Sequence, residues 1–441
     1  MKILLLILMA AFSSSSFAQN VDPLFLNQLL NGEDQFVTGL ITHKKAVEVD
    51  YTVATKIQIA QLQRSNEILS SKVLEVFQSY TRSKPQVQNI WLADTVIVKA
   101  KVSEWRQVLD QFNDYKIIAN HKIDLIKPIG EPLEALETTD NPVNYGLDKI
   151  GVTKVWQEFG LSGKGVTVGV IDSGWASHPD LDGKVILSKD FTGEFEGAGP
   201  NDLMGHGTHC MGIIGGGDAS GTPIGVAPDV KFIVARIFPK EGSGSLAVVL
   251  NAMQWIADPD GDYDTDDRPD LISNSWGSLA QTYLWEPTLR WKKTFNIMPI
   301  FAAGNRGPRK RTVGAPGGYP HVFAVGATDQ NDDLTSFSSR GFSVYYRKRY
   351  IKPDVVAPGF EIYSSYLNQG YRYWSGTSMA TPFVAGIAAL ILQAKPNLKV
   401  GQLEKILSEA TIDMGKEGKD NQFGHGRIQA YEAVKAALEN Y

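Results

Sequence analysis

Three polar side chains of this 441-residue chain occur where they could carry out nucleophilic chemistry together, and the first is Ser378. It lies in GTSMATP (376–382), directly before an apolar segment that is typical of a buried helix. A serine at the first turn of a helix is surrounded by free backbone N–H groups, which would stabilise an oxyanion formed by its attack. The position also suits an ordinary helix-capping serine, so Ser378 needs partners before it can be assigned a role.

Asp172 and His206 are the partners that such a serine requires. Asp172 follows the apolar run at 166–171, and His206 lies in GHGTHCMG (205–212). An imidazole can take the serine proton, while a carboxylate holds the imidazole in one tautomer and stabilises its charged form. His206 and His209 could instead bind zinc, but neither an HExxH pattern nor a cysteine pair accompanies them in the sequence.

The elements that must position these residues are apolar strands that alternate with helices from about residue 145 onwards. Strands are predicted at 166–171, 230–238, 271–277, 297–305 and 322–328, with a helix at 246–257. This alternation predicts an α/β fold with a parallel sheet and helices on both faces. Sites in such sheets lie beyond the carboxyl ends of the strands, where Asp172 and Asn305 both fall.

The first 18 residues have the pattern of a secretory signal peptide. Lys2 precedes a short apolar run at 3–12, and a small-x-small sequence ends at Ala18. The apolar run is too short to span a bilayer. We therefore expect a secreted protein, extracellular or periplasmic, that has no membrane association once the signal is removed.

Residues 19–140 are predicted to form a separate module with its linker. A helix at 52–80, a strand at 95–102, a short helix capped by Ser103 and a second strand at 116–126 indicate a small α+β module. Prolines and acidic residues between 127 and 144 indicate an extended linker that a protease could cut. Residues 141–441 then form a single catalytic domain.

The motifs VIDSG (170–174), GHGTH and GTSMATP, in the order Asp–His–Ser, resemble the signature motifs of the subtilisin-like serine peptidases, or subtilases. The resemblance covers about residues 145–437. It implies that Ser378 is the nucleophile, His206 the general base and then acid, and Asp172 the orienting carboxylate. Asn305, in AAGN, corresponds to the oxyanion-hole asparagine. The expected function is that of a secreted serine endopeptidase that needs no cofactor for catalysis.

The same resemblance implies how a peptide substrate would bind. SWG (275–277) and AAG (302–304) correspond to the walls of the primary specificity pocket, Gly314 to its floor, and GSGS (242–245) to a strand that pairs with extended substrates. The expected substrate-binding residues are Gly244, Ser275, Trp276, Gly277, Ala302, Ala303, Gly304 and Gly314. Trp276 could line the pocket or belong to the core.

A basic cluster and a cysteine lie near these motifs. Arg306 and the basic residues at 309–311 are favoured as a solvated loop, the alternative being that Arg306 selects acidic substrate side chains. Cys210 is the only cysteine, and we interpret it as a small buried apolar residue, as in thiol-containing subtilases.

The segment DPDGDYDTDDRPD (258–270) holds seven aspartates. Carboxylates at alternate positions of a tight loop suit calcium, although the spacing matches an EF-hand only loosely, and a solvated acidic loop is the alternative. A similar insertion occurs in the bacillopeptidase F-like branch of the family. The predicted structural ligands are Asp258, Asp260, Asp262, Asp264 and Asp266. Asp180 matches a calcium ligand of many subtilases, but the loop at 217–223 lacks the usual accompanying ligands.

The N-terminal module fits a propeptide that acts as an intramolecular inhibitor and is removed by self-processing, with a stable accessory domain as the alternative. The net charge of −5 argues against a nucleic-acid partner. A catalytically silent relative used for binding is disfavoured by the complete set of Asp172, His206, Asn305 and Ser378. An α/β-hydrolase esterase would need G-x-S-x-G and a histidine after the serine, and neither is found.

Overall fold

A computed structural model of the chain describes residues 20–134, 144–197, 199–278 and 282–441. The expected signal peptide and residues 135–143, half of the expected linker, lie outside these ranges. The chain divides into two compact units. One comprises residues up to 122 together with 245–254, and the other comprises 123–244 and 255–441. The boundary therefore falls at Lys122, so residues 123–134 belong with the larger unit rather than with the N-terminal module.

The N-terminal module is an α+β structure, as the sequence predicts. Its sheet has the strand order β2-β3-β1-β4, and β1 pairs antiparallel with both neighbours. Three helices accompany this sheet, and their aromatic side chains Phe25, Phe77 and Trp105 pack edge to face in its core. The elements are α2 (Pro23–Asn31), β1 (Phe36–His43), α3 (Thr55–Thr81), β2 (Gln86–Ile90), β3 (Thr95–Lys101), α4 (Val102–Val108) and β4 (Tyr115–Ala119).

Two local predictions in this module were wrong. The strand expected over 116–126 is two strands, because β4 ends at Ala119 and β5 (Lys122–Leu125) begins after a turn in which the His121 N–H donates to the Ala119 carbonyl at 2.8 Å. The helix expected to start with Ser103 as its cap begins at Val102. Its first turn is closed by the Glu104 carboxylate, which accepts from the Lys101 N–H at 2.8 Å.

The larger unit contains a nine-stranded sheet in the order β20-β21-β17-β14-β13-β11-β7-β9-β8. All neighbouring strands are parallel except the edge pair β20–β21. The five predicted apolar strands correspond to β7, β9, β11, β13 and β14, which confirms the α/β prediction. The strands are β7 (Thr167–Asp172), β8 (Val185–Asp190), β9 (Lys231–Arg236), β11 (Leu271–Asn274), β13 (Met298–Ala302), β14 (Phe323–Thr328), β17 (Val355–Pro358), β20 (Thr411–Ile412) and β21 (Arg427–Ile428).

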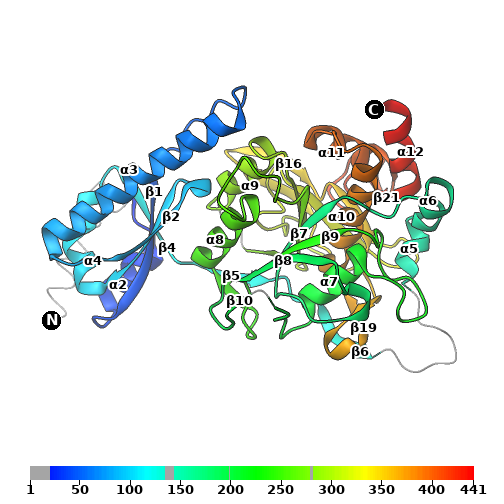
Figure 1. Cartoon of the computed structure of the whole chain (residues 1–441), viewed down its shortest axis with the longest axis horizontal. Helices are drawn as coiled ribbons and strands as arrows, with labels where there is room; N and C mark the ends of the chain where they lie inside the picture. The colour runs from blue at the N-terminus through cyan, green and yellow to red at the C-terminus, as the bar shows by residue number, and fades with distance from the viewer. Residues whose placement is uncertain (1–19, 135–143, 198, 279–281) are drawn as a thin grey trace. The chain divides into compact units, whose positions relative to one another are not determined.

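Helices cover both faces of this sheet (Figure 1). On one face α10 packs against β11, β13, β14 and β17 and also against α7, while α9 packs on β13 from the other face. The helices are α5 (Tyr145–Lys149), α6 (Val152–Phe159), α7 (His206–Gly215), α8 (Leu246–Ala257), α9 (Trp285–Lys293), α10 (Thr377–Ala394), α11 (Val400–Glu409) and α12 (Ala430–Asn440).

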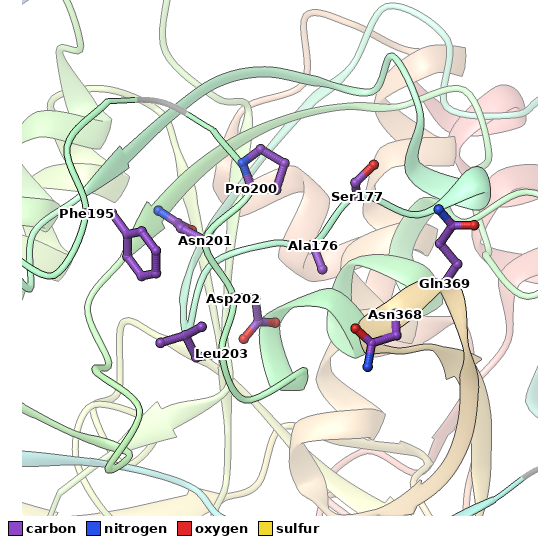
Figure 2. A pocket seen from close by; sticks show the side chains of 9 residues that line it. All are labelled: Ala176, Ser177, Phe195, Pro200, Asn201, Asp202, Leu203, Asn368 and Gln369. Carbon is purple, nitrogen blue, oxygen red and sulfur yellow. The ribbon is translucent and has the colours of Figure 1, made fainter.

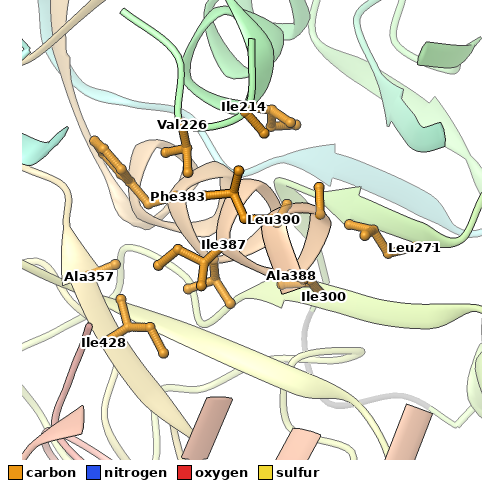
Figure 3. Close-up of a cluster of buried hydrophobic side chains, with 14 of the residues drawn as sticks. Ile214, Val226, Leu271, Ile300, Ala357, Phe383, Ile387, Ala388, Leu390 and Ile428 are labelled. Carbon is orange, nitrogen blue, oxygen red and sulfur yellow. The ribbon is translucent and has the colours of Figure 1, made fainter. Parts of the chain in front are cut away.

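Helix α10 is the centre of the hydrophobic core. Figure 3 shows Phe383, Ile387 and Leu390 of this helix among side chains from β11, β13, β17 and β21. Its length and apolar composition would also suit a membrane span, but 89% of it is buried inside the protein, as in the core helix of a globular domain. The burial fixes the N-terminus of α10, and with it Ser378, relative to the sheet.

Three small sheets flank the main one. β5 lies between β10 (Ser243–Ser245) and β12 (Trp276–Gly277), and β19 (Tyr371–Ser375) lies between β18 (Ile362–Ser365) and β6 (Ile129–Glu134). The third is the hairpin of β15 (Gly341–Tyr345) and β16 (Lys348–Lys352). The first two matter for function because their middle strands meet the nucleophile region.

Candidate active site

Asp172 and His206 form a buried hydrogen-bonded pair. Asp172 is the last residue of β7 and His206 the first of α7, and His206 Nδ1 donates to Asp172 Oδ1 at 2.7 Å. Burial lowers the pKa of His206, but the charge of Asp172 and the hydrogen bond to it, together with the neighbouring Cys210, raise this pKa well above 6.5. The tautomer fixed by this bond leaves Nε2 free to accept a proton.

The start of α7 is held by a carboxylate that the sequence did not single out. Asp202 is buried, and Oδ1 accepts from the Ser173 hydroxyl and from the N–H groups of Met204 and Gly205, each at 2.9 Å. Oδ2 accepts from the N–H and hydroxyl of Thr208 at 3.0 and 2.7 Å. Asp202 therefore ties the residue after Asp172 to both sides of His206.

Ser378 and Asn305 meet at the N-terminus of α10. Asn305 Oδ1 accepts from both the N–H and the hydroxyl of Thr377 at 2.9 Å. This pairing turns the Asn305 Nδ2 group away from the helix, and Nδ2 donates to the carbonyl of Lys127 at 2.9 Å. The amide is thus oriented as a donor toward a peptide carbonyl, as an oxyanion-hole residue must be.

Cys210 links the two halves of the site. Its sulfur lies 3.9 Å from His206 Nδ1 and 3.4 Å from the Ser378 carbonyl oxygen. Burial raises the pKa of the thiol, so Cys210 stays protonated. The structure agrees with the sequence interpretation of Cys210 as a buried small side chain.

A segment of the chain itself lies against the nucleophile. The Ser378 hydroxyl donates to the Ile126 carbonyl at 3.0 Å, while the buried His206 Nε2 has no hydrogen-bond partner in the described part of the chain. The Ser–His hydrogen bond of a catalytic triad is therefore replaced here by a bond from the serine to a backbone carbonyl.

The residues before Ile126 bind in the groove as an extended strand. Leu125 and Asp124 pair antiparallel with Trp276 and Gly277. On the same side, the Ile126 N–H donates to the Ser275 carbonyl at 3.4 Å. Toward β10, the Leu125 N–H donates to the Gly242 carbonyl at 3.3 Å, and the Ser243 hydroxyl donates to Asp124 at 2.8 Å. This is β-augmentation from both sides of a groove.

The residues after Lys127 continue past Ser378 as a second strand. β6 pairs antiparallel with β19, with Ile129 opposite Ser375 and Leu133 opposite Tyr373. Ser375 lies three residues before Ser378. Residues 123–134 therefore pair with protein strands on both sides of the nucleophile.

Gly277 and Gly314 are two of the residues expected to form the specificity pocket. A Cβ atom added to Gly277 would lie 2.9 Å from the Ala315 carbonyl and 3.7 Å from Ile126 Cδ1, so Ile126 sits beside this wall. At Gly314 a Cβ atom would lie 2.1 Å from an Arg306 Nη atom, which places the Arg306 guanidinium against the expected floor.

The other residues expected to bind substrate differ in their surroundings. The Trp276 side chain is fully buried and packs on Phe301 with ring centroids 5.1 Å apart, so it belongs to the core and only its backbone faces the groove. Ala302 and Ala303 are buried, and the Gly304 N–H donates to the Thr377 hydroxyl at 3.1 Å. Gly244 packs its backbone on the Ile237 carbonyl, where a Cβ atom would be 2.6 Å away.

His209 is a buried residue of α7 that makes a hydrogen bond through its ring. Its Nε2 pairs with the Arg372 carbonyl at 3.1 Å, and burial lowers its pKa to about 3, so it is a neutral structural residue.

The aspartate loop groups Asp258 and Asp260 with Asp267, which the sequence interpretation had not included. Asp262, Asp264 and Asp266 lie outside that group.

A separate pocket of about 330 Å³ lies near the start of α7 (Figure 2). Its lining residues are Ala176, Ser177, Phe195, Pro200, Asn201, Asp202, Leu203, Asn368 and Gln369. Asp202, which supports the turn around His206, also lines this pocket, but no residue of the triad does. The peptide groove and this pocket are therefore different features.

Sequence reasoning missed Asp202, Thr377 and the groove-bound segment. The sequence pattern places residues 123–126 in a strand of the N-terminal module and Lys127 in the linker, although the position of this segment at the start of the linker is an available signal. Asp202 gives little signal, because a single aspartate before a glycine-rich helix start is a common turn former.

Comparisons with known proteins agree with this geometry. The Subtilase family model matches residues 163–426. Serine protease AprX of Bacillus subtilis (strain 168) is 38% identical over 305 residues, which cover 62% of this chain and 67% of that protein. Bacillopeptidase F of the same organism is 33% identical over 390 residues, which cover 80% of this chain but 26% of that protein. Subtilisin DY of Bacillus licheniformis is 35% identical over 297 residues, which cover 66% of this chain and 99% of that protein.

The matched segment contains Asp172, His206, Asn305 and Ser378, the residues that the fold brings together at the ends of β7, β13 and the N-termini of α7 and α10. The chain therefore belongs to the subtilase family of serine endopeptidases.

Proposed function

We propose that this protein is a secreted endopeptidase made as a zymogen, which cleaves its own chain in the segment that lies in its substrate groove. The observation that carries the proposal is the bond from the Ser378 hydroxyl to the Ile126 carbonyl, made while residues 124–126 pair with Ser275–Gly277. Such a segment excludes other peptides from the groove until it is cut and leaves.

The chemistry follows from the positions of the side chains. Ser378 Oγ attacks the peptide carbonyl as His206 Nε2 takes its proton, and Asp172 stabilises the resulting imidazolium. Asn305 Nδ2 and the Ser378 N–H donate to the oxyanion of the tetrahedral intermediate. His206 then gives its proton to the leaving amine, which leaves an acyl-enzyme on Ser378. A water molecule, deprotonated by His206, hydrolyses this ester.

The backbone pairing selects the Ile126–Lys127 bond for cleavage. Ile126 donates its N–H to Ser275, and its side chain lies beside Gly277, where the residue before the cleaved bond would enter the specificity pocket. The Asn305 bond to the Lys127 carbonyl would favour the next bond instead, but that bond precedes Pro128. Proline fixes φ and restricts the residue before it, so we favour the Ile126–Lys127 bond.

The test is the mass of the purified protein. We expect the wild-type chain to yield a fragment whose N-terminus is Lys127, and Ser378→Ala to keep residues 19–441 intact. A fluorophosphonate probe should label the wild-type chain alone. The same fragment from Ser378→Ala would contradict self-processing. The catalytic assignment of Ser378 would be contradicted if the probe did not label the wild-type chain and only an added protease cut it.

Secretion and the conformation of the substrate are further parts of the proposal. Export is supported by the signal-peptide pattern of residues 1–18, and fusion of those residues to a reporter should direct it out of the cytoplasm. Because the groove binds backbone atoms through Ser275, Gly277 and Gly242, we expect protein and peptide substrates in an extended conformation.

A further inference from the structure

The aspartate loop at 258–270 connects α8 to β11 and begins with a carboxylate in an unfavourable place. Asp258 directly follows the last residue of α8, Ala257, and its N–H donates to the Trp255 carbonyl at 3.1 Å. The C-terminal end of a helix carries a partial negative charge that disfavours a carboxylate. Asp258 is nevertheless buried there, with 8% of its surface exposed.

Two further aspartates lie next to Asp258. One ligand atom from each of Asp258, Asp260 and Asp267 lies within 4.8 Å of the other two. The Asp260 N–H donates to Asp267 Oδ2 at 2.9 Å, which brings the two ends of the loop together. Calcium binds carboxylate oxygens at about 2.3–2.6 Å, so three oxygens that lie within 4.8 Å of one another can share one calcium ion.

The buried oxygens of this cluster have no protein donor. Asp258 Oδ1 and Asp267 Oδ1 are both buried without a hydrogen-bond partner among the described residues. Arg268, the cation of the loop, donates to two backbone carbonyls and packs over the Phe295 ring at 5.6 Å. Buried carboxylates in this condition are costly unless a cation balances them.

Asp180 shows the contrast within the same unit. Its Oδ1 accepts from the Ala219 N–H at 2.8 Å and its Oδ2 from the Tyr371 hydroxyl at 2.6 Å. Protein donors therefore reach both oxygens of this buried carboxylate. The carboxylates at 258 and 267 differ because their inward oxygens are left without donors.

We propose that Asp258, Asp260 and Asp267 bind one structural calcium ion, with backbone carbonyls or water completing the oxygen shell. The site is independent of the catalytic residues and joins the end of α8 to the start of β11. β11 leads directly into Ser275–Gly277, so the ion stabilises the connection on which the groove strand depends. Asp262 lies outside this cluster of three carboxylates.

The test uses the full-length Ser378→Ala chain, which cannot digest itself, and calcium chloride as the probe. Calorimetric titration should give binding at this site, and calcium at a hundred times its Kd should raise Tm by about 5 °C over the protein in EGTA. Asp258→Asn and Asp267→Asn should weaken calcium binding at least tenfold. Asp266→Asn is the matched control, because Asp266 is exposed in the same loop outside the cluster, and it should stay within twofold.

The sign of the Tm change distinguishes a cation site from a simple loss of packing. In EGTA, Asp258→Asn should melt above its parent because a buried charge has been neutralised, and in calcium it should melt below. The exposed ligand variant Asp260→Asn should show the weaker binding without altering a buried residue, which keeps the test valid if the other variants fail to fold. A parent whose Tm is the same in calcium and EGTA, or an Asp260→Asn variant that binds calcium as tightly as Asp266→Asn, would overturn the proposal.

Discussion

The charge of Asp172 on His206 determines how the activity responds to pH. The pKa of His206 is held well above 6.5, and the imidazole must be neutral to take the Ser378 proton. Activity is therefore lost when the pH falls below this elevated pKa, because His206 becomes protonated. We expect the acidic limb of the kcat/KM profile of the processed enzyme to lie above pH 6.5.

Asp172→Asn tests that electrostatic argument. Removing the carboxylate charge should move the acidic limb to lower pH and reduce kcat by about 10⁴, the size seen for the equivalent change in a serine protease triad. The variant should be purified after processing by an external protease, so that the catalytic step alone is measured. An acidic limb at the same pH in both enzymes would show that Asp172 does not set the pKa of His206.

Arg306 is expected to influence which substrates are cut. Its guanidinium lies against Gly314 and donates to the Ser278 carbonyl at 3.3 Å, and no carboxylate pairs with it within the described ranges. Arg306→Gln should lower kcat/KM roughly tenfold for peptides with glutamate before the cleaved bond, relative to those with leucine. Arg309→Gln, an exposed neighbour, is the control. An unchanged glutamate-to-leucine ratio would favour the interpretation of Arg306 as part of a solvated loop.

At the scale of elements, the catalytic geometry depends on the turn before α7. Asp202 accepts bonds from Ser173 after β7 and from Gly205 and Thr208 around His206, so it fixes a strand end relative to a helix start. Small displacements of catalytic groups cost about 10²-fold in rate. Asp202→Ala should therefore lower kcat by about that factor.

The readouts for Asp202→Ala separate positioning from simple destabilisation. KM and the pH of the acidic limb should change little, because neither the groove strands nor Asp172 are altered, and Asp202→Asn should recover part of kcat by keeping some acceptor bonds. A fall in kcat that disappears when the assay is moved well below the melting temperature would instead assign the loss to unfolding.

Sequence patterns identified the elements better than they identified side-chain environments. Asp172, Asn305 and Ser378 could be assigned because their motifs resemble those of the subtilases, and the strand-end positions of Asp172 and Asn305 agree with a site at the edge of a parallel sheet. The burial of the Trp276 side chain could not be predicted, because the sequence is the same whether this side chain lines the pocket or packs in the core. Among seven aspartates, the inclusion of Asp267 depends on the closure of the loop, which residue spacing does not reveal.

At the scale of the whole molecule, the groove-bound segment makes self-processing a unimolecular reaction. Because residues 123–134 already lie in the groove of their own chain, the rate constant for loss of the full-length form should not depend on protein concentration. Gel time courses over a hundredfold dilution would measure it. Processed wild-type enzyme mixed with full-length Ser378→Ala provides the comparison, and cleavage of that variant as fast as the wild-type chain processes itself would contradict the prediction.

The pairing of residues 123–134 with strands on both sides of Ser378 also has a consequence for the reverse reaction. After hydrolysis, the new carboxyl end at Ile126 is held by β12 and the new amine at Lys127 by the contacts of β6 with β19. Two tethered ends meet at a high effective concentration, which favours religation. The broken peptide bond can therefore be remade by the same acyl-enzyme until one end departs. Release of a strand, rather than chemistry, would then make the maturation of this enzyme irreversible.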